Sequence, residues 1–326
     1  MNSSRTFTVL RDAAVLEVTG PERTSWLQGM VTTDVLGLVP GECRYGLTLD
    51  AKGRILADLT IVHDRDAPRL LLIATASGLD ALRVHLLGML IAEDAEVTPM
   101  SLGGPIVSVR GIAVAPGESL VTEVGGVRVM AVANPRSGRG DVDVWAIEPT
   151  TEGAFVDALT AAGFALESGD VFDAARIANG VPLLGRDFGP DTLPQEAGLH
   201  DALHWGKGCY IGQETVARLG HRGQTSRELR LVTFEGRVAQ DCTVVYGEDR
   251  APVGTVRSAA PLGSQTLALV ILKRKAFEHR SQLVAVTETG DIPGEVSATL
   301  IRGFVERRPW NSPDYKANRP HTALRG

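Results

Sequence analysis

Short strand patterns dominate the first half of this chain, and too few helical patterns lie among them for a regular strand–helix–strand alternation. Strand patterns fall at 14–18, 45–49, 54–63, 70–75, 107–114, 128–133 and 143–147, and helical patterns at 22–30, 78–92 and 151–162. The segment 50–53, Asp-Ala-Lys-Gly, predicts a hairpin turn between the second and third strands. This mixture favours an α+β architecture over a doubly wound parallel sheet.

The second half predicts a small separate β domain. A polar break at 220–224 precedes further strand patterns at 230–234, 242–246, 252–257, 267–272 and 282–286. We therefore expect residues 1–226 to form one module of two α+β subdomains, which need not be continuous in sequence, and 227–306 to form a β-barrel-like domain. Repeated Pro and Asn residues predict a disordered tail at 307–326. Five leucines at helical spacing are expected to lie in the core, namely Leu79, Leu82, Leu86, Leu87 and Leu90.

Composition argues against several kinds of partner. The 326 residues carry a net charge of −6 spread along the chain, so RNA is not expected as a direct partner. The three cysteines are far apart and form no C-x-x-C pair, which is typical of reduced thiols and predicts no resident metal. A ligand set of Cys209, His204 and His221 is the less favoured alternative. The N-terminus lacks a signal-peptide core and the longest apolar run, 267–272, is too short to span a bilayer, so a cytoplasmic protein without membrane contact is expected.

The segment 207–214, Lys-Gly-Cys-Tyr-Ile-Gly-Gln-Glu, gathers a thiol, an ammonium and a carboxylate around two glycines. The glycines predict a turn, and good helix formers follow at 213–219, so Cys209 is expected in a loop just ahead of a helix. The helix dipole and Lys207 would favour the thiolate there. A reactive, solvent-reachable Cys209 is therefore the favoured interpretation. The alternative is a small buried hydrophobic residue in a tight turn.

This octapeptide resembles, at every position, the signature K-G-C-Y-x-G-Q-E of the YgfZ family, folate-binding relatives of the glycine-cleavage T-protein. Segments 18–34, 180–187 and 192–199 are also similar to that family, so the resemblance extends over roughly residues 6 to 300. It implies a T-protein-like fold in which several domains form a ring around a central tetrahydrofolate site. The small C-terminal β domain would complete this α+β arrangement.

The resemblance also implies where folate would bind. Tyr45 falls on a folate-contacting tyrosine of T-protein, and Asp58 falls on the key aspartate of that enzyme. Asp58 is therefore our first choice for a pterin contact, with a solvent-facing strand residue as the alternative. For Tyr45 an ordinary core or rim position is equally favoured. Ala57 and Val62 stand where T-protein has a second acid and a further tyrosine, which predicts an altered site.

Further candidates follow from what folate requires. Cationic groups are needed for its glutamate tail, and Arg176 and Arg186 are the candidates, with simple solvation as the alternative. Glu196 is an additional pocket candidate by resemblance, whereas His204 and Trp205 are expected to pack behind the cysteine loop. The full set of expected folate contacts is Tyr45, Asp58, Arg176, Arg186, Glu196, Gly208, Tyr210, Gly212, Gln213 and Glu214.

Cys209, Lys207 and Asp58 are the candidate catalytic residues. Cys209 would act as a soft iron ligand, a nucleophile or a redox-sensitive group, and Lys207 would stabilise its thiolate. For Gln213 and Glu214, helix capping and first-turn charge are equally favoured roles.

By resemblance, the preferred function is a tetrahydrofolate-binding accessory protein for assembly or repair of iron–sulfur enzymes, particularly those with [4Fe–4S] clusters. Its partners would be iron–sulfur client or assembly proteins, and Cys209 would act near the folate. A folate-dependent aminomethyl or one-carbon transferase is the second hypothesis, motivated by Asp58, so whether the chain is an enzyme stays open. A non-catalytic partner module linked to RNA modification is the third.

Overall fold

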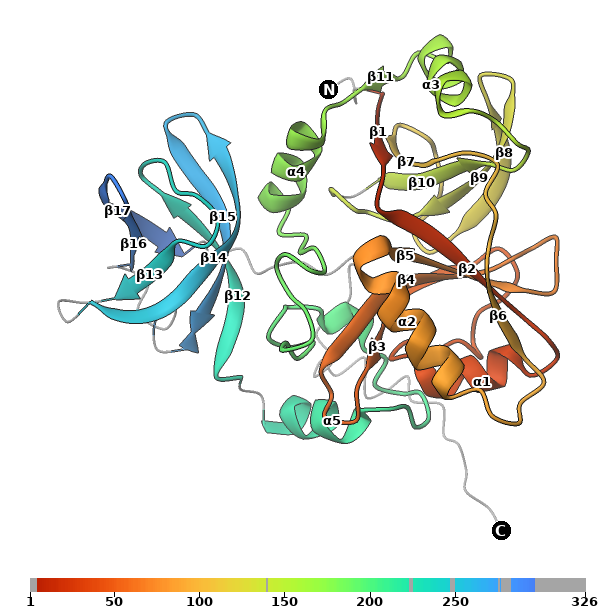
Figure 1. Cartoon of the computed structure of the whole chain (residues 1–326), viewed down its shortest axis with the longest axis horizontal. Coiled ribbons are helices and arrows are strands. Elements are labelled where there is room, and N and C mark those ends of the chain that lie inside the picture. The colour runs from red at the N-terminus through yellow and green to blue at the C-terminus, as the bar shows by residue number, and fades with distance from the viewer. Residues whose placement is uncertain are drawn as a thin grey trace.

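The computed structural model describes residues 5–138, 140–222, 225–246, 250–274, 276 and 283–296. Within them, two packed sheets lie on one side and a closed barrel on the other (Figure 1). The predicted disordered tail, 307–326, lies outside the described residues, as do positions 223 and 224 of the predicted polar break and position 282 of the last predicted strand.

The first sheet has five antiparallel strands and carries the predicted hairpin. Its strands in spatial order are β3 (Cys43–Leu49), β4 (Ile55–His63), β5 (Leu70–Thr75), β2 (Ala13–Thr19) and β6 (Glu96–Pro99). Helices α1 (Arg23–Met30) and α2 (Ala76–Gly88) pack on one face, where Leu27 and Leu82 join Leu59 in a buried cluster. Alternate side chains of β4 point to the opposite face, because successive strand residues alternate between faces.

The second sheet packs against that opposite face. Its strands in spatial order are β11 (Ala165–Leu166), β1 (Thr6–Leu10), β7 (Ile106–Arg110), β10 (Asp141–Ala146), β9 (Val127–Ala133) and β8 (Ser119–Val124). Helix α3 (Glu152–Ala161) buries Phe155 and Leu159 against it. Val62 and Ile73 of the first sheet share a core cluster with Val132 and Trp145 of the second, so the two sheets form one packed body.

The C-terminal strands close into a six-stranded antiparallel barrel. Around it run β12 (Arg227–Phe234), β15 (Gln265–Lys273), β14 (Ala251–Leu262), β13 (Thr243–Tyr246), β16 (Leu283–Thr287) and β17 (Gly290–Val296). The barrel has its own core, which includes Phe234, Val256 and Leu272. An α+β protein with a C-terminal barrel was the fold class expected, and the structure confirms it. The exact domain boundaries stay a prediction.

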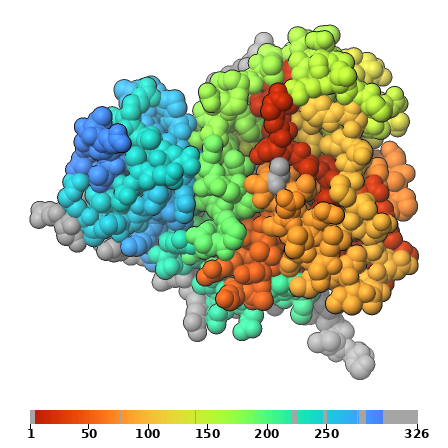
Figure 2. Space-filling model, viewed as in Figure 1, coloured from red at the N-terminus to blue at the C-terminus, as the bar shows by residue number. Residues whose placement is uncertain are grey.

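A connecting segment joins the barrel to the two sheets. It contains α4 (Gly169–Ala178), the short 3-10 helix η1 (His200–Ala202) and α5 (Gln213–Arg222). The space-filling view shows the α4 region, in green, wedged between the blue barrel and the orange sheet module (Figure 2). Ile177 of α4 packs with Leu229 and Leu269 of the barrel, so this segment forms a real interface.

Some sequence expectations need correction. The helix predicted at 78–92 is α2 and ends at Gly88, and Leu87 is 41% exposed rather than part of the core. The strand predicted at 107–114 ends at Arg110, because Gly111 turns the chain with a φ of 104°. The strand patterns of β1, β6, β8, β11 and β17 and the helical pattern of α4 were not recognised in the sequence.

Candidate functional site

Tyr45 and Asp58 come from the two strands of one hairpin. Tyr45 on β3 lies opposite Thr60 on β4, and Asp58 points to the same face as Thr60 because it lies two residues away. The Tyr45 hydroxyl donates a hydrogen bond to Asp58 Oδ2 at 3.0 Å. The antiparallel register thus brings together the two residues that were predicted to contact folate.

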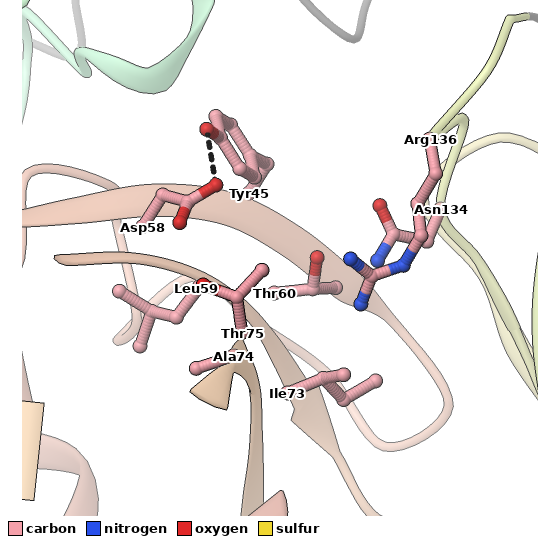
Figure 3. A pocket seen from close by; sticks show the side chains of 9 residues that line it. All are labelled: Tyr45, Asp58, Leu59, Thr60, Ile73, Ala74, Thr75, Asn134 and Arg136. Atoms are coloured by element: carbon pink, nitrogen blue, oxygen red, sulfur yellow. Dashed lines mark hydrogen bonds between the residues drawn. The ribbon is translucent and has the colours of Figure 1, made fainter. Parts of the chain in front are cut away.

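These two side chains line a pocket between the two sheets, whose empty space is about 260 Å³ with the open solvent at its mouth included (Figure 3). The first sheet supplies Thr60 from β4 and Thr75 from β5, and the segment after β9 supplies Asn134 and Arg136. The remaining lining residues are Leu59, Ile73 and Ala74. The pocket therefore combines an apolar floor with a few directed polar groups, as small-molecule sites do.

The carboxyl group of Asp58 is buried, although a carboxylate ordinarily prefers water. Burial raises the pKa of Asp58, and the Tyr45 hydrogen bond and the positive charge of Arg136 oppose that rise. Its Oδ1 atom is buried and has no hydrogen-bond partner in the described part of the chain. An acceptor left in this state costs free energy unless a ligand or water supplies a donor. Burial, with the neighbouring Asp58 charge, also raises the pKa of Tyr45.

Arg136 is a site residue that sequence reasoning missed. Its Nε donates to both carboxylate oxygens of Asp143 on β10, at 2.8 and 2.9 Å, and Asp143 is fully buried. Asn134 Nδ2 donates to the same carboxylate at 2.8 Å. The side chain of Asp143 therefore orients both pocket residues. No local sequence signal marks Arg136, because the segment of 133–137 reads as an ordinary loop.

The cysteine loop lies where the sequence predicted. Cys209 is exposed and precedes α5, which begins at Gln213. The loop is tied to α1 by backbone hydrogen bonds from Ile211 N to Gly29 O at 3.2 Å and from His204 N to Thr32 O at 3.0 Å. Exposure of the thiol fits the interpretation of Cys209 as solvent-reachable rather than buried.

Lys207 has surroundings that the sequence did not suggest. Its Nζ donates to the carbonyl oxygens of Gln28, Val31 and Thr33 at 2.6, 2.5 and 2.8 Å, and the side chain is buried. The ammonium also lies 5.1 Å from the centre of the Tyr210 ring. Burial lowers the pKa of Lys207 to about 8. All three of its N–H donors are thus used at the C-terminal end of α1, which makes a direct role at the Cys209 thiol a weaker interpretation.

Gly212 joins the cysteine loop to the pocket hairpin. Its φ is 81°, and a Cβ added there would lie 2.5 Å from the carbonyl oxygen of Asp50 in the β3–β4 turn. Gly53 in that turn packs against Gly212 and Thr215 in the same way. Asp58 lies five residues beyond Gly53, roughly 17 Å along the strand. No residue of 207–214 lines the Tyr45–Asp58 pocket, so the motif and the pocket are neighbours rather than one site.

The other predicted folate contacts have structural partners. Arg176 is 2% exposed and donates to Asp187 at 2.7 Å and to Ser258 Oγ on β14 at 2.7 Å, which leaves no surface for a ligand carboxylate. Glu196 is buried and paired with Arg227 on β12 at 3.2 Å. We therefore assign both residues to the interface with the barrel and do not retain them in the site.

Arg186 is more exposed, but it forms an ion pair with Asp173 at 2.7 Å and lies outside the pocket lining. Glu214 is exposed in the first turn of α5, which agrees with the dipole role weighed for it. Trp205 packs against the core of the first sheet, behind the loop as expected.

Among the residues that the structure describes, no group of three or more His, Cys, Asp or Glu side chains is arranged to hold a metal ion. The side chain of His221, part of the alternative ligand set with Cys209 and His204, lies outside that part of the chain. No helix in the described ranges is long and apolar enough to cross a bilayer.

Comparison with known proteins places this geometry in context. A family model described as the GCVT N-terminal domain matches residues 10–111, which include the pocket hairpin. A tRNA-modifying protein YgfZ from Serratia proteamaculans is 27% identical over 301 residues, covering 84% of this chain and 86% of that protein. The protein of the same name from Vibrio atlanticus is 26% identical over 229 residues, or 69% of each chain.

One further sequence relative and one solved structure carry the name aminomethyltransferase. The sequence relative, from Chlorobium phaeobacteroides, is 27% identical over 318 residues, covering 90% of this chain and 83% of that protein. The crystal structure of glycine cleavage system aminomethyltransferase T from Bartonella henselae matches with a TM-score of 0.77 at 17% identity, covering 94% of this chain and 88% of that one. The fold is therefore that of an aminomethyltransferase T protein. The chain is a relative of the YgfZ proteins, and the resemblance inferred from the octapeptide is confirmed.

Proposed function

We propose that this protein binds tetrahydrofolate through the Tyr45–Asp58 pocket and supports assembly or repair of [4Fe–4S] enzymes through Cys209. The observation that carries the folate part is the buried Oδ1 of Asp58, which has no hydrogen-bond partner among the described residues. A pterin presents N–H groups along one edge, and these would supply the missing donor. Resemblance to the YgfZ family motivates the iron–sulfur part.

The pocket would hold only the pterin head of folate. Its empty space of about 260 Å³ includes the open solvent at its mouth, so it is too small to enclose a complete drug-sized ligand. The glutamate tail would then extend beyond the pocket mouth. Tyr45 would supply an aromatic wall, and Asp58 would fix the orientation of the ring.

Cys209 would bind the iron–sulfur cluster, which would be the cargo or substrate of this protein. A thiolate is a soft ligand that suits iron in clusters, and the exposed position of Cys209 lets a client protein reach it. The hairpin turn at Asp50–Gly53 contacts Gly212 of the cysteine loop. Ligand binding on that hairpin would therefore have a direct packing route to the thiol.

A folate-dependent aminomethyl or one-carbon transferase is the alternative that a specific observation favours. Asp58 and Tyr45 keep their hydrogen bond inside a pocket, and a relative of similar length is named aminomethyltransferase. Because other relatives are named tRNA-modifying proteins, a partner role in tRNA modification is the third hypothesis. Iron–sulfur client proteins and a cytoplasmic location remain predictions of the preferred hypothesis.

The test is complementation of cells that lack this protein. The activities of several [4Fe–4S] enzymes are measured after expression of wild type, Cys209→Ser, Asp58→Asn or Cys242→Ser at matched protein levels. Cys242→Ser is the control because Cys242 is also a free cysteine but lies in the barrel. We expect wild type and Cys242→Ser to restore activity and Cys209→Ser to fail. Normal client activities without the protein would reject the iron–sulfur role, and loss only in Asp58→Asn would favour the transferase.

A further inference from the structure

Arg136 presents unused hydrogen-bond donors to the pocket. Its Nε is held by Asp143, and no hydrogen bond from its two terminal nitrogens is found within the described ranges. Figure 3 shows these nitrogens directed towards Thr60, on the side of the pocket across from Asp58 and Tyr45. The guanidinium is therefore fixed in orientation at one edge and available at the other.

The charges around the pocket decide what kind of group Arg136 can bind. Arg136 is the one cation among the lining residues, whereas Asp58 lines the pocket and Asp143 lies behind it. Asp12 adds a further negative charge that acts on both Asp58 and Arg136. The positive charge is thus already balanced by the fixed pair with Asp143. A ligand carboxylate would be repelled by the surplus of acids, while a neutral oxygen would accept from Arg136 without that penalty.

Asp58 and Arg136 therefore make opposite demands on the ligand. Oδ1 of Asp58 requires a donor, and the terminal nitrogens of Arg136 require an acceptor. A flat heterocycle that carries ring N–H or amino donors and an oxo group satisfies both residues at once. An analogue with an amino group in place of the oxo group would direct N–H against N–H at Arg136.

We propose that Arg136 recognises the oxo group of the ligand head, so that the pocket selects 4-oxo pteridines over 4-amino pteridines. This inference rests on the proposed folate function and assigns the second sheet a part in ligand choice. Sites built to hydrogen-bond a particular substrate group discriminate strongly against analogues that leave their buried polar groups unpaired.

The test compares two ligands on the same protein. Dissociation constants are measured anaerobically by calorimetry for tetrahydrofolate and for tetrahydroaminopterin, which differ in the 4-oxo or 4-amino group and in the N3–H that accompanies the oxo group. The wild type should prefer tetrahydrofolate by about 10- to 100-fold. In Arg136→Gln the preference should fall to within about threefold, because an amide can donate to one ligand and accept from the other. Arg128→Ala is the control, since Arg128 is an exposed arginine on β9, and it should keep the wild-type preference.

Each outcome bears on the inference separately from the folate function. The double variant Arg136→Gln/Asp143→Asn, which leaves no unpaired buried carboxylate behind the pocket, replaces Arg136→Gln if the latter does not fold. It should lose the preference in the same way, because its amide can also donate to one ligand and accept from the other. An unchanged preference in folded Arg136 variants overturns the inference and leaves folate binding standing. Weaker tetrahydrofolate binding with unchanged binding of tail-free 6-methyltetrahydropterin would overturn it as well, since Arg136 would then serve the tail. If the wild type binds neither ligand, the proposed function itself fails.

Discussion

Replacing Lys207 by Met tests whether the motif lysine holds the fold of the cysteine loop. The substitution removes three charge-assisted hydrogen bonds to the carbonyls of Gln28, Val31 and Thr33. Bonds to a charged group contribute about 1.5–3 kcal/mol each. Against them stands the cost of burying the ammonium. A fall of its pKa from 10.5 to about 8 corresponds to about 3 kcal/mol. The difference predicts that Lys207→Met loses roughly 1–6 kcal/mol of stability.

Thermal unfolding followed by circular dichroism measures this loss. For a protein of this size we expect the Tm of Lys207→Met to fall by roughly 2–9 °C. Lys52→Met is the matched control, because Lys52 is exposed in the hairpin turn, and its Tm should stay within about 1 °C. Alkylation of Cys209 by iodoacetamide separates the two roles of Lys207. Slower alkylation of Lys207→Met with an unchanged Tm would refute the structural role and support direct stabilisation of the thiolate.

Three further substitutions have defined outcomes. Asp58→Asn should be at least as stable as wild type at pH 7, because burial raises the pKa of Asp58 in the folded state and its carboxylate form costs stability. The Tm difference should therefore grow as the pH rises above 3.8, and a clearly lower Tm for Asp58→Asn at pH 7 would contradict this. Gly212→Ala should lose about 1–3 kcal/mol of stability in urea unfolding. Gly208→Ala, whose Cβ would meet no atom within 4 Å, should lose none. Equal urea midpoints for the two variants would refute the close approach of Gly212 to Asp50. Arg176→Met should lose about 3–5 kcal/mol of stability in urea unfolding, because it breaks the buried ion pair with Asp187, whereas exposed Arg186→Met should lose less than about 1 kcal/mol. Similar losses in the two variants would show that burial of the Arg176–Asp187 pair is unimportant.

Local signals explain what could be predicted from the sequence. The hairpin of β3 and β4 was recognisable because two strand patterns flank a turn sequence at 50–53, and the structure has that turn with Gly53 N donating to Asp50 O. The loop position of Cys209 followed from glycines before a helical pattern. Helix α4 was missed although Ser168 caps it and Ala174 and Ile177, three residues apart, pack on the barrel.

Long-range contacts explain what could not be predicted. Arg136 reaches the pocket from a loop 78 residues beyond Asp58, through sheet packing that no local pattern encodes. The partners of Lys207 are backbone carbonyls, which leave no trace in side-chain identity. Arg176 has the residue type expected of an anion-binding group, but only tertiary structure shows that Asp187 and Ser258 already occupy it.

Direct binding of tetrahydrofolate tests the central claim that the Tyr45–Asp58 pocket is a folate site. Calorimetric titration under anaerobic conditions should show one ligand bound per wild-type chain. Asp58→Asn, which keeps the fold but presents an amide to the pterin, should bind at least about tenfold more weakly, as expected when a charged hydrogen-bond acceptor is removed. Asp66→Asn, an exposed acid beyond β4, should bind like wild type. Absence of binding by the wild type, or equal affinity of wild type and Asp58→Asn, would contradict the account.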